Sequence, residues 1–147
     1  GTRTFAEQWQ TNSLLFPLIR KLVTERWAAN LLVMLLLVGI IAGTLIRYDM
    51  RDSCRFVWSA FLVLGAAFLL SPVGNPWYFL WLVPFLCVFP IRSWILRSGL
   101  LGLYYVYFFL TYRRQGETFR WVIWLEYLPF YTMLAWEWAR KRMKDEN

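Results

Sequence analysis

The sequence predicts an all-α, polytopic transmembrane helical bundle with about five crossings, preceded by an N-terminal interfacial amphipathic segment. Apolar residues make up 59% of the 147 residues and charged residues only 17%, with a mean hydropathy of +0.42. A soluble domain carries about a quarter charged residues. Residues 56–91 contain no charge at all, and the chain has ten Trp, a residue that collects where hydrocarbon meets water.

The charge pattern and the rare residue types exclude several classes of protein. The net charge is +7, but the basic residues form short clusters between apolar runs, which is typical of membrane loops and argues against nucleic acid as a partner. The absence of His removes the commonest general base and the commonest transition-metal ligand. Cys54 and Cys87 are not spaced as a metal pair, and nothing supports a disulfide between them. No cofactor is identified, and assistance by a divalent metal stays open.

Residues 1–26 are too polar to cross a membrane. They carry an apolar stripe, which favours either an interfacial amphipathic piece or an ordinary packed loop. Asn12 or Ser13 is expected to cap a short helix here, while Pro17 favours a helix start near itself. The chain starts at Gly1 without the features of a signal peptide, so we expect a fragment of a longer protein.

Residues 27–147 form the expected transmembrane domain. The uncharged stretch 27–46 has the length that about 30 Å of hydrocarbon requires, and a polar loop follows it. As one helix, residues 56–91 would measure about 54 Å, which is too long for one crossing. The turn formers of SPVGNP, residues 71–76, therefore divide the stretch into helices 56–71 and 77–91. Pro84 interrupts the second helix, which leaves tilting, kinking and re-entry open.

The last two crossings are expected at residues 98–112 and 121–139. Arg92 and Arg97 bracket a small loop before the first of these, and a polar, basic tail follows the second. Five crossings place the termini on opposite sides of a cell membrane, inner or plasma. A slight excess of basic residues on the side of the tail predicts a cytoplasmic C-terminus and an extracytoplasmic N-terminus. The uncharged bend 71–76 then lies outside.

The outer segments carry the candidate binding residues. The bend presents Trp77 and Tyr78, whose flat rings suit a sugar ring or a lipid chain, although the residues by themselves favour an aromatic belt beside a tight turn. Asn12 and Asn75 are candidates to bond acceptor hydroxyls, and Asn75 is alternatively a turn residue. Trp9 either covers the sugar or anchors its segment.

Two segments of the chain resemble bacterial polyprenol-phosphate-dependent glycosyltransferases of the GT-C type, mannosyltransferase-like and near glycosyltransferase family 87. SPVGNPWY followed by FLWLVPFL is similar to a motif of these enzymes, which usually have His where this chain has Asn75. TFAEQWQTNSLLFPLI resembles their extracytoplasmic segment. The matching positions there are Phe5, Ala6, Trp9, Asn12, Leu15 and Phe16.

The resemblance implies transfer of a sugar, such as mannose, from a polyprenyl-phosphate donor to a lipid-linked or cell-envelope glycan acceptor on the outer face of the membrane. These enzymes carry a catalytic carboxylate in their first extracytoplasmic loop, near the N-terminus, and this chain has no such loop. It therefore resembles only the C-terminal membrane portion, with catalytic residues unassigned. The implied partners are membrane lipid, the donor, the acceptor and the missing N-terminal part of the same protein.

The leaving phosphate of such a transfer needs cations. Arg113, Arg114 and Arg120 are the candidate contact, because an Arg fork bonds two phosphate oxygens at once, although a solvated loop or lipid head groups would explain them too. A carboxylate in hydrocarbon is costly, so Glu126 either lines the substrate cavity or reaches interfacial water or an Arg from another loop. The alternative function is a non-enzymatic membrane scaffold or partner subunit of an envelope complex. A transporter fragment is a weaker third.

Overall fold

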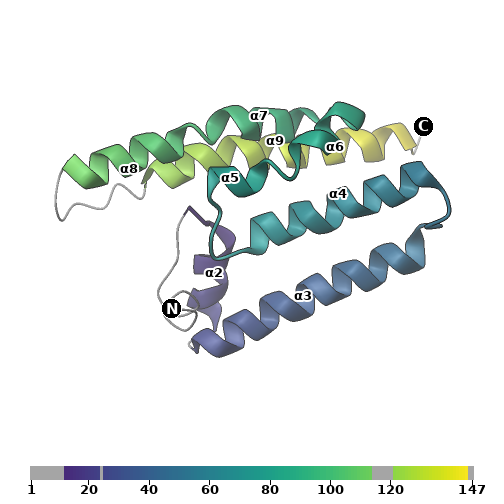
Figure 1. The fold of residues 1–147 in the computed structure, drawn as a ribbon, viewed down its shortest axis with the longest axis horizontal. Helices are drawn as coiled ribbons and strands as arrows, with labels where there is room; N and C mark the ends of the chain where they lie inside the picture. Colours follow the sequence, from purple (N-terminus) through teal and green to yellow (C-terminus); the bar gives the residue numbers. More distant parts are fainter. Residues whose placement is uncertain (1–11, 24, 114–120, 146–147) are drawn as a thin grey trace. The chain divides into compact units, whose positions relative to one another are not determined.

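The structure, a computed structural model, describes residues 12–23, 25–113 and 121–145. The regular elements of these residues are α-helices, as the sequence predicts. The chain divides into two compact units, Gly1–Phe85 and Leu86–Asn147, and each is described by itself (Figure 1).

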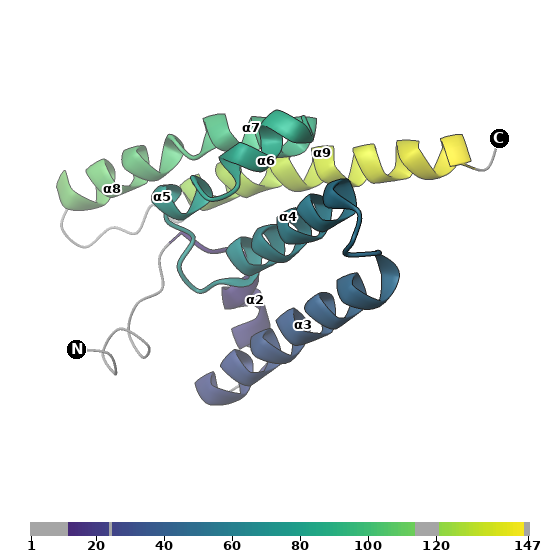
Figure 2. The same cartoon turned by 45° about the vertical axis from the view of Figure 1, so that its right-hand side comes forward.

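The first unit is built on a pair of long antiparallel helices, α3 (Arg26–Arg47) and α4 (Ser53–Leu70). Both views show them side by side, joined by a short loop (Figures 1 and 2). The shorter α2 (Leu15–Leu22) contacts both helices at the end opposite this loop. The predicted crossings 27–46 and 56–71 therefore correspond to real helices, with boundaries shifted by one to three residues.

A small core holds α2 in place. The side chain of Phe16 is fully buried and packs with Ala29 and Val33 of α3. Three partly buried side chains complete this core: Ile19, Leu37 and Leu70. The described part of the N-terminal segment is therefore a packed helix, and an interfacial position for it remains a prediction.

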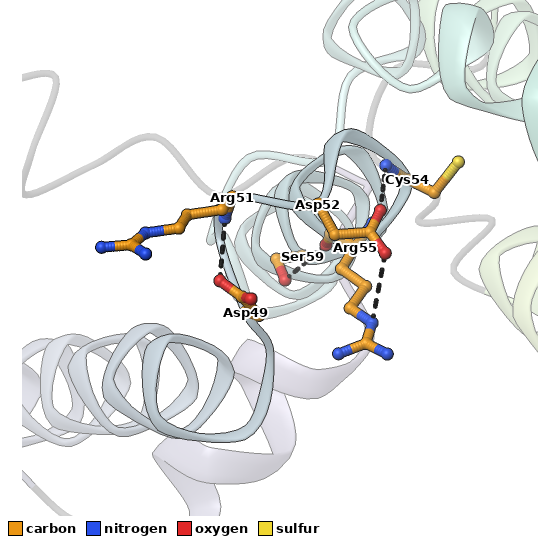
Figure 3. A network of polar contacts seen from close by, with 6 residues as sticks. All are labelled: Asp49, Arg51, Asp52, Cys54, Arg55 and Ser59. Carbon is orange, nitrogen blue, oxygen red and sulfur yellow. Dashed lines mark hydrogen bonds and ion pairs between the residues drawn. The ribbon is translucent and has the colours of Figure 1, made fainter.

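The loop between α3 and α4 carries a polar network (Figure 3). Asp52 is the N-cap of α4, and its Oδ1 accepts hydrogen bonds from the backbone N–H groups of Cys54 at 2.9 Å and Arg55 at 3.3 Å. The other oxygen of Asp52 forms an ion pair with Arg55 at 3.4 Å. Asp49 accepts from the N–H of Arg51 at 3.0 Å. The N-terminus of a helix has orphan N–H donors, and Asp52 satisfies two of them, so this loop sets where α4 begins.

The segment predicted as one helix over 77–91 is instead two short helices, α5 (Pro76–Phe79) and α6 (Val83–Val88). Hydrogen bonds of the i to i+3 type link them, from Leu80 N to Trp77 O through to Phe85 N to Leu82 O. This tighter 3₁₀ pattern keeps the backbone bonded where the α-helix breaks. Pro84 is the second residue of α6, where its missing N–H costs nothing, so it starts a helix and does not interrupt one.

The second unit pairs α9 (Trp121–Asp145) with two consecutive helices, α7 (Arg92–Leu100) and α8 (Leu103–Arg113), which run along it in the opposite direction (Figures 1 and 2). A tight turn at Leu101 and Gly102 joins α7 to α8. The prediction that Arg92 and Arg97 bracket a loop before a helix over 98–112 is wrong, since both residues lie on α7. The helix predicted over 121–139 continues to Asp145 and contains Pro129.

Within the described residues, three helical segments are long and apolar enough to cross a membrane: α3 (Arg26–Arg47), α4 (Ser53–Leu70) and Arg92–Leu110, which comprises α7 and most of α8. Their lengths of 22, 18 and 19 residues match the thickness of the hydrocarbon core. The chain thus has the helices of a membrane protein.

Candidate functional site

The bend 71–76 is held by two side chains from the start of the chain. The Asn12 amide nitrogen donates to the carbonyl oxygen of Gly74 at 3.0 Å, and the Ser13 hydroxyl donates to that of Ser71 at 2.8 Å. Both donors are almost fully buried. Residues some sixty positions apart in sequence therefore form one small structure at the end of α4.

Asn12 does this from an unusual backbone conformation. Its φ of 47° lies in the left-handed region, which Asn tolerates better than most residues other than Gly. The sequence predicted Asn12 or Ser13 as a helix cap, and this is wrong. The N-cap of α2 is Leu14, with no side-chain cap, because the Asn12 amide and the Ser13 hydroxyl bond the distant bend instead.

Hydrogen bonds within the bend also stabilise it. The Ser71 hydroxyl donates to the carbonyl of Val73 at 3.0 Å and accepts from the N–H of the same residue at 3.1 Å. Asn75 is the N-cap of α5, where its carbonyl accepts from Tyr78 N at 3.1 Å and Pro76 fills the first helical position. The Asn75 side chain is only 3% exposed, so it is placed as part of the bend and not as a surface donor.

Helix α5 anchors one aromatic ring and presents two others. Phe79 is buried, and its ring meets that of Phe68 of α4 edge-on, with centroids 5.5 Å apart. Trp77 is 48% exposed. Tyr78 lies beside it at 6.0 Å between centroids and also contacts Trp81 at 5.9 Å. The predicted exposure of Trp77 is confirmed, and Phe79 is the buried residue that holds the exposed rings in position.

Glu126 lies in the second unit, in a different polar cluster. Its carboxylate is fully buried and pairs with Arg97 of α7 at 2.5 Å, and the Arg97 guanidinium stacks over the ring of Tyr127, 3.8 Å from its centroid. The sequence analysis gave an Arg from another loop as one possible partner of Glu126. The partner is indeed an Arg, but it belongs to a helix. The signal that was missed is a pair of opposite charges, Arg97 and Glu126, each preceded by apolar residues in one of two neighbouring helices.

Of the three arginines in the predicted cation cluster, only Arg113 is among the described residues. Arg113 is the last residue of α8 and is exposed, with its guanidinium 5.1 Å from the ring centroid of Phe109. Arg114, Arg120 and Trp9 lie outside the described residues. Within the described ranges, no group of three or more Cys, Asp or Glu side chains is placed to hold a metal ion.

Comparisons with known proteins add no assignment. No protein-family model matches this chain, and neither does any curated protein or any solved structure.

Proposed function

We propose that the chain is the C-terminal membrane portion of a GT-C-type glycosyltransferase that uses a polyprenyl-phosphate sugar donor. In this proposal the bend 71–76 and α5 form part of the outer lip of the active site. The catalytic carboxylate is contributed by the N-terminal part of the same protein.

One observation supports the proposal above the others. The two segments that carry the resemblance are about sixty residues apart, and their polar residues are hydrogen-bonded to each other in the structure, Asn12 to Gly74 and Ser13 to Ser71. The antiparallel pairing of α3 with α4 brings these two segments to the same end of the first unit, and the hydrogen bonds fix their contact there. A buried carbonyl that loses its donor costs about 1–3 kcal/mol, so this arrangement requires Asn or a similar donor at position 12.

In this proposal the candidate residues have two different roles. Asn12 and Asn75 are buried and hold the shape of the bend. Trp77 and Tyr78 are accessible, and their rings offer flat apolar faces for one side of a sugar ring. In this proposal Trp77 and Tyr78 contact substrate, while the two Asn residues position them.

The proposed topology has five crossings, with the bend on the outer face and the basic tail in the cytoplasm. Segment 77–91 is the third crossing and is a broken helix. Its i to i+3 bonds support this, because non-helical backbone at membrane depth needs internal partners or protein around it.

The test uses the full-length protein in membranes and measures sugar transfer from a polyprenyl-phosphate donor. Trp77→Ala should lower kcat/KM several-fold, since one aromatic contact contributes on the order of 1 kcal/mol. Asn12→Asp keeps the size of the side chain but removes the donor to Gly74, and it should lower transfer as well. Trp136→Ala is the matched control, because Trp136 is 50% exposed on α9.

Loss of transfer in the first two variants, with normal membrane levels and an active Trp136→Ala protein, would support the assignment. Normal sugar transfer in both variants would mean that the bend is not part of the active site. A full-length protein that transfers no sugar from any polyprenyl-phosphate donor would instead favour the non-enzymatic scaffold.

A further inference from the structure

The last turns of α9 extend beyond the helix that packs against it. The Glu137 carboxylate accepts hydrogen bonds from the backbone N–H groups of Arg92 at 3.1 Å and Ser93 at 3.3 Å, so position 137 lies level with the first turn of α7. From there α9 continues to Asp145, about two turns or roughly 12 Å further (Figures 1 and 2). The segment Arg92–Leu110, which is long and apolar enough to span, begins at the same level. When this segment crosses a bilayer, the last turns of α9 lie in the layer of polar head groups beyond the hydrocarbon core.

These last turns, residues 138–144, carry a concentrated positive charge. Their four basic residues are all exposed: Arg140, Lys141, Arg142 and Lys144. None of the four forms an ion pair with a side chain in the described part of the chain. Asp145 and Glu146 come next in the sequence, so the stretch still carries more positive than negative charge. We call residues 138–144 the basic end of α9, and its charge is complementary to an anionic partner.

An exposed aromatic ring lies at the start of the basic end. Trp138 is 60% exposed, and the central carbon of the Arg142 guanidinium lies 4.1 Å from its ring centroid. A guanidinium that stacks on a ring by its face keeps its N–H groups at its edge, where they match the paired oxygens of a phosphate. Trp itself prefers the boundary between hydrocarbon and polar head groups. This combination suits a lipid surface better than a dissolved acidic protein or a nucleic acid.

We propose that the basic end of α9 binds the head groups of anionic phospholipids. Four or more Lys and Arg directly after a spanning helix attract anionic lipid, and each cation strengthens the attraction about fivefold, which corresponds to about 1 kcal/mol. The basic end lies roughly 25 Å or more along α9 from Trp121, the residue that follows the predicted arginine cluster. It is therefore separate from the residues proposed for the donor phosphate, and the inference does not depend on the enzymatic activity.

The experiment measures which lipids the full chain retains. The purified protein is equilibrated in detergent with equal amounts of phosphatidylglycerol and phosphatidylcholine, and the lipids bound to each chain are counted by native mass spectrometry. We expect a preference for phosphatidylglycerol that weakens as the salt concentration rises. Arg140→Gln with Arg142→Gln should reduce this preference more than about tenfold, because two cations are lost. Lys141→Gln with Lys144→Gln should have a similar effect and gives the same test if the first variant fails to fold.

Arg51→Gln with Arg55→Gln is the matched control, since both residues are exposed and the same two charges are removed. The loop that carries them also contains Asp49 and Asp52, so its charge is nearly balanced (Figure 3). This variant should keep the wild-type preference for phosphatidylglycerol.

Three results would overturn the proposal. The first is equal retention of the two phospholipids by the wild type. The second is the same loss of preference in the control and in the basic-end variants. The third is binding of an acidic peptide, in nanodiscs of phosphatidylcholine, that depends on Arg140 and Arg142 and that phosphatidylglycerol does not displace.

Discussion

The guanidinium Nη1 of Arg97 lies 2.5 Å from the carboxylate Oε1 of Glu126, in an ion pair that joins α7 to α9. Both side chains are fully buried, and the rings of Tyr127 and Phe130 lie against the guanidinium at 3.8 and 5.9 Å. A charged group at the centre of a bilayer costs about 2.5–3.5 kcal/mol on insertion scales, and pairing lowers that cost for both helices. The pair also fixes the register of α7 against α9.

Removing one partner of this pair should destabilise the second unit strongly. Glu126→Gln leaves the Arg97 charge buried without its counter-ion, and we expect a loss of about 3–5 kcal/mol in the free energy of unfolding. Unfolding in mixed micelles of detergent and SDS measures the change. The double variant Arg97→Met with Glu126→Gln removes both charges and should recover most of the loss. If Glu126→Gln unfolds like the wild type, the pair is not formed in the membrane.

Glu137 caps a helix other than its own. Its Oε1 accepts from the N–H of Arg92 at 3.1 Å, and its Oε2 accepts from the N–H and hydroxyl of Ser93 at 3.3 and 2.6 Å. Glu137→Ala should cost about 1 kcal/mol, as loss of an N-cap does, and should raise amide hydrogen exchange in the first turn of α7. Thr132→Ala is the control, because Thr132 is exposed and bonds only the nearby Pro129 carbonyl. Unchanged exchange in Glu137→Ala would mean that α7 starts without this cap.

The capping hydrogen bonds of Asp52 should contribute more to the stability of α4 than its ion pair with Arg55. Asp52→Ala removes the acceptor for two backbone N–H groups and should lower stability by about 1 kcal/mol. Arg55→Ala removes only an exposed pair and should change stability by less than about 1 kcal/mol. Asp52→Asn keeps a capping oxygen and should resemble the wild type. Equal losses in Asp52→Ala and Arg55→Ala, measured by thermal unfolding in detergent, would contradict the capping argument.

The proposed topology places Cys54 on the cytoplasmic side. Cys54 is exposed in the first turn of α4 (Figure 3). In a Cys87→Ser variant, a membrane-impermeant maleimide should label Cys54 in inside-out vesicles and not in intact cells. The Cys54→Ser, Cys87→Ser double variant gives the background. Labelling of Cys54 from the outer side would show that the proposed orientation is wrong and that the bend does not lie on the outer face.

The helical nature of the chain and the helices α3 and α4 followed from the sequence alone. A run of apolar residues must be removed from water and must satisfy its own backbone, and in hydrocarbon a helix achieves this within a single segment. Composition is therefore sufficient for α3 and α4. The turn at 71–76 was also predictable, because Pro, Gly and Asn act through local backbone geometry.

The tertiary structure decided which distant residues meet. Asn12 looked like a helix cap because capping is a local rule, but its amide bonds the Gly74 carbonyl. Arg97 looked like a loop residue because a charge usually marks the end of a span, yet Glu126 neutralises it inside the helix pair. In both cases the energy of a buried polar group depends on a partner far away in sequence. The sequence around a residue does not identify that partner, because the packing of the helices determines which distant residues come into contact.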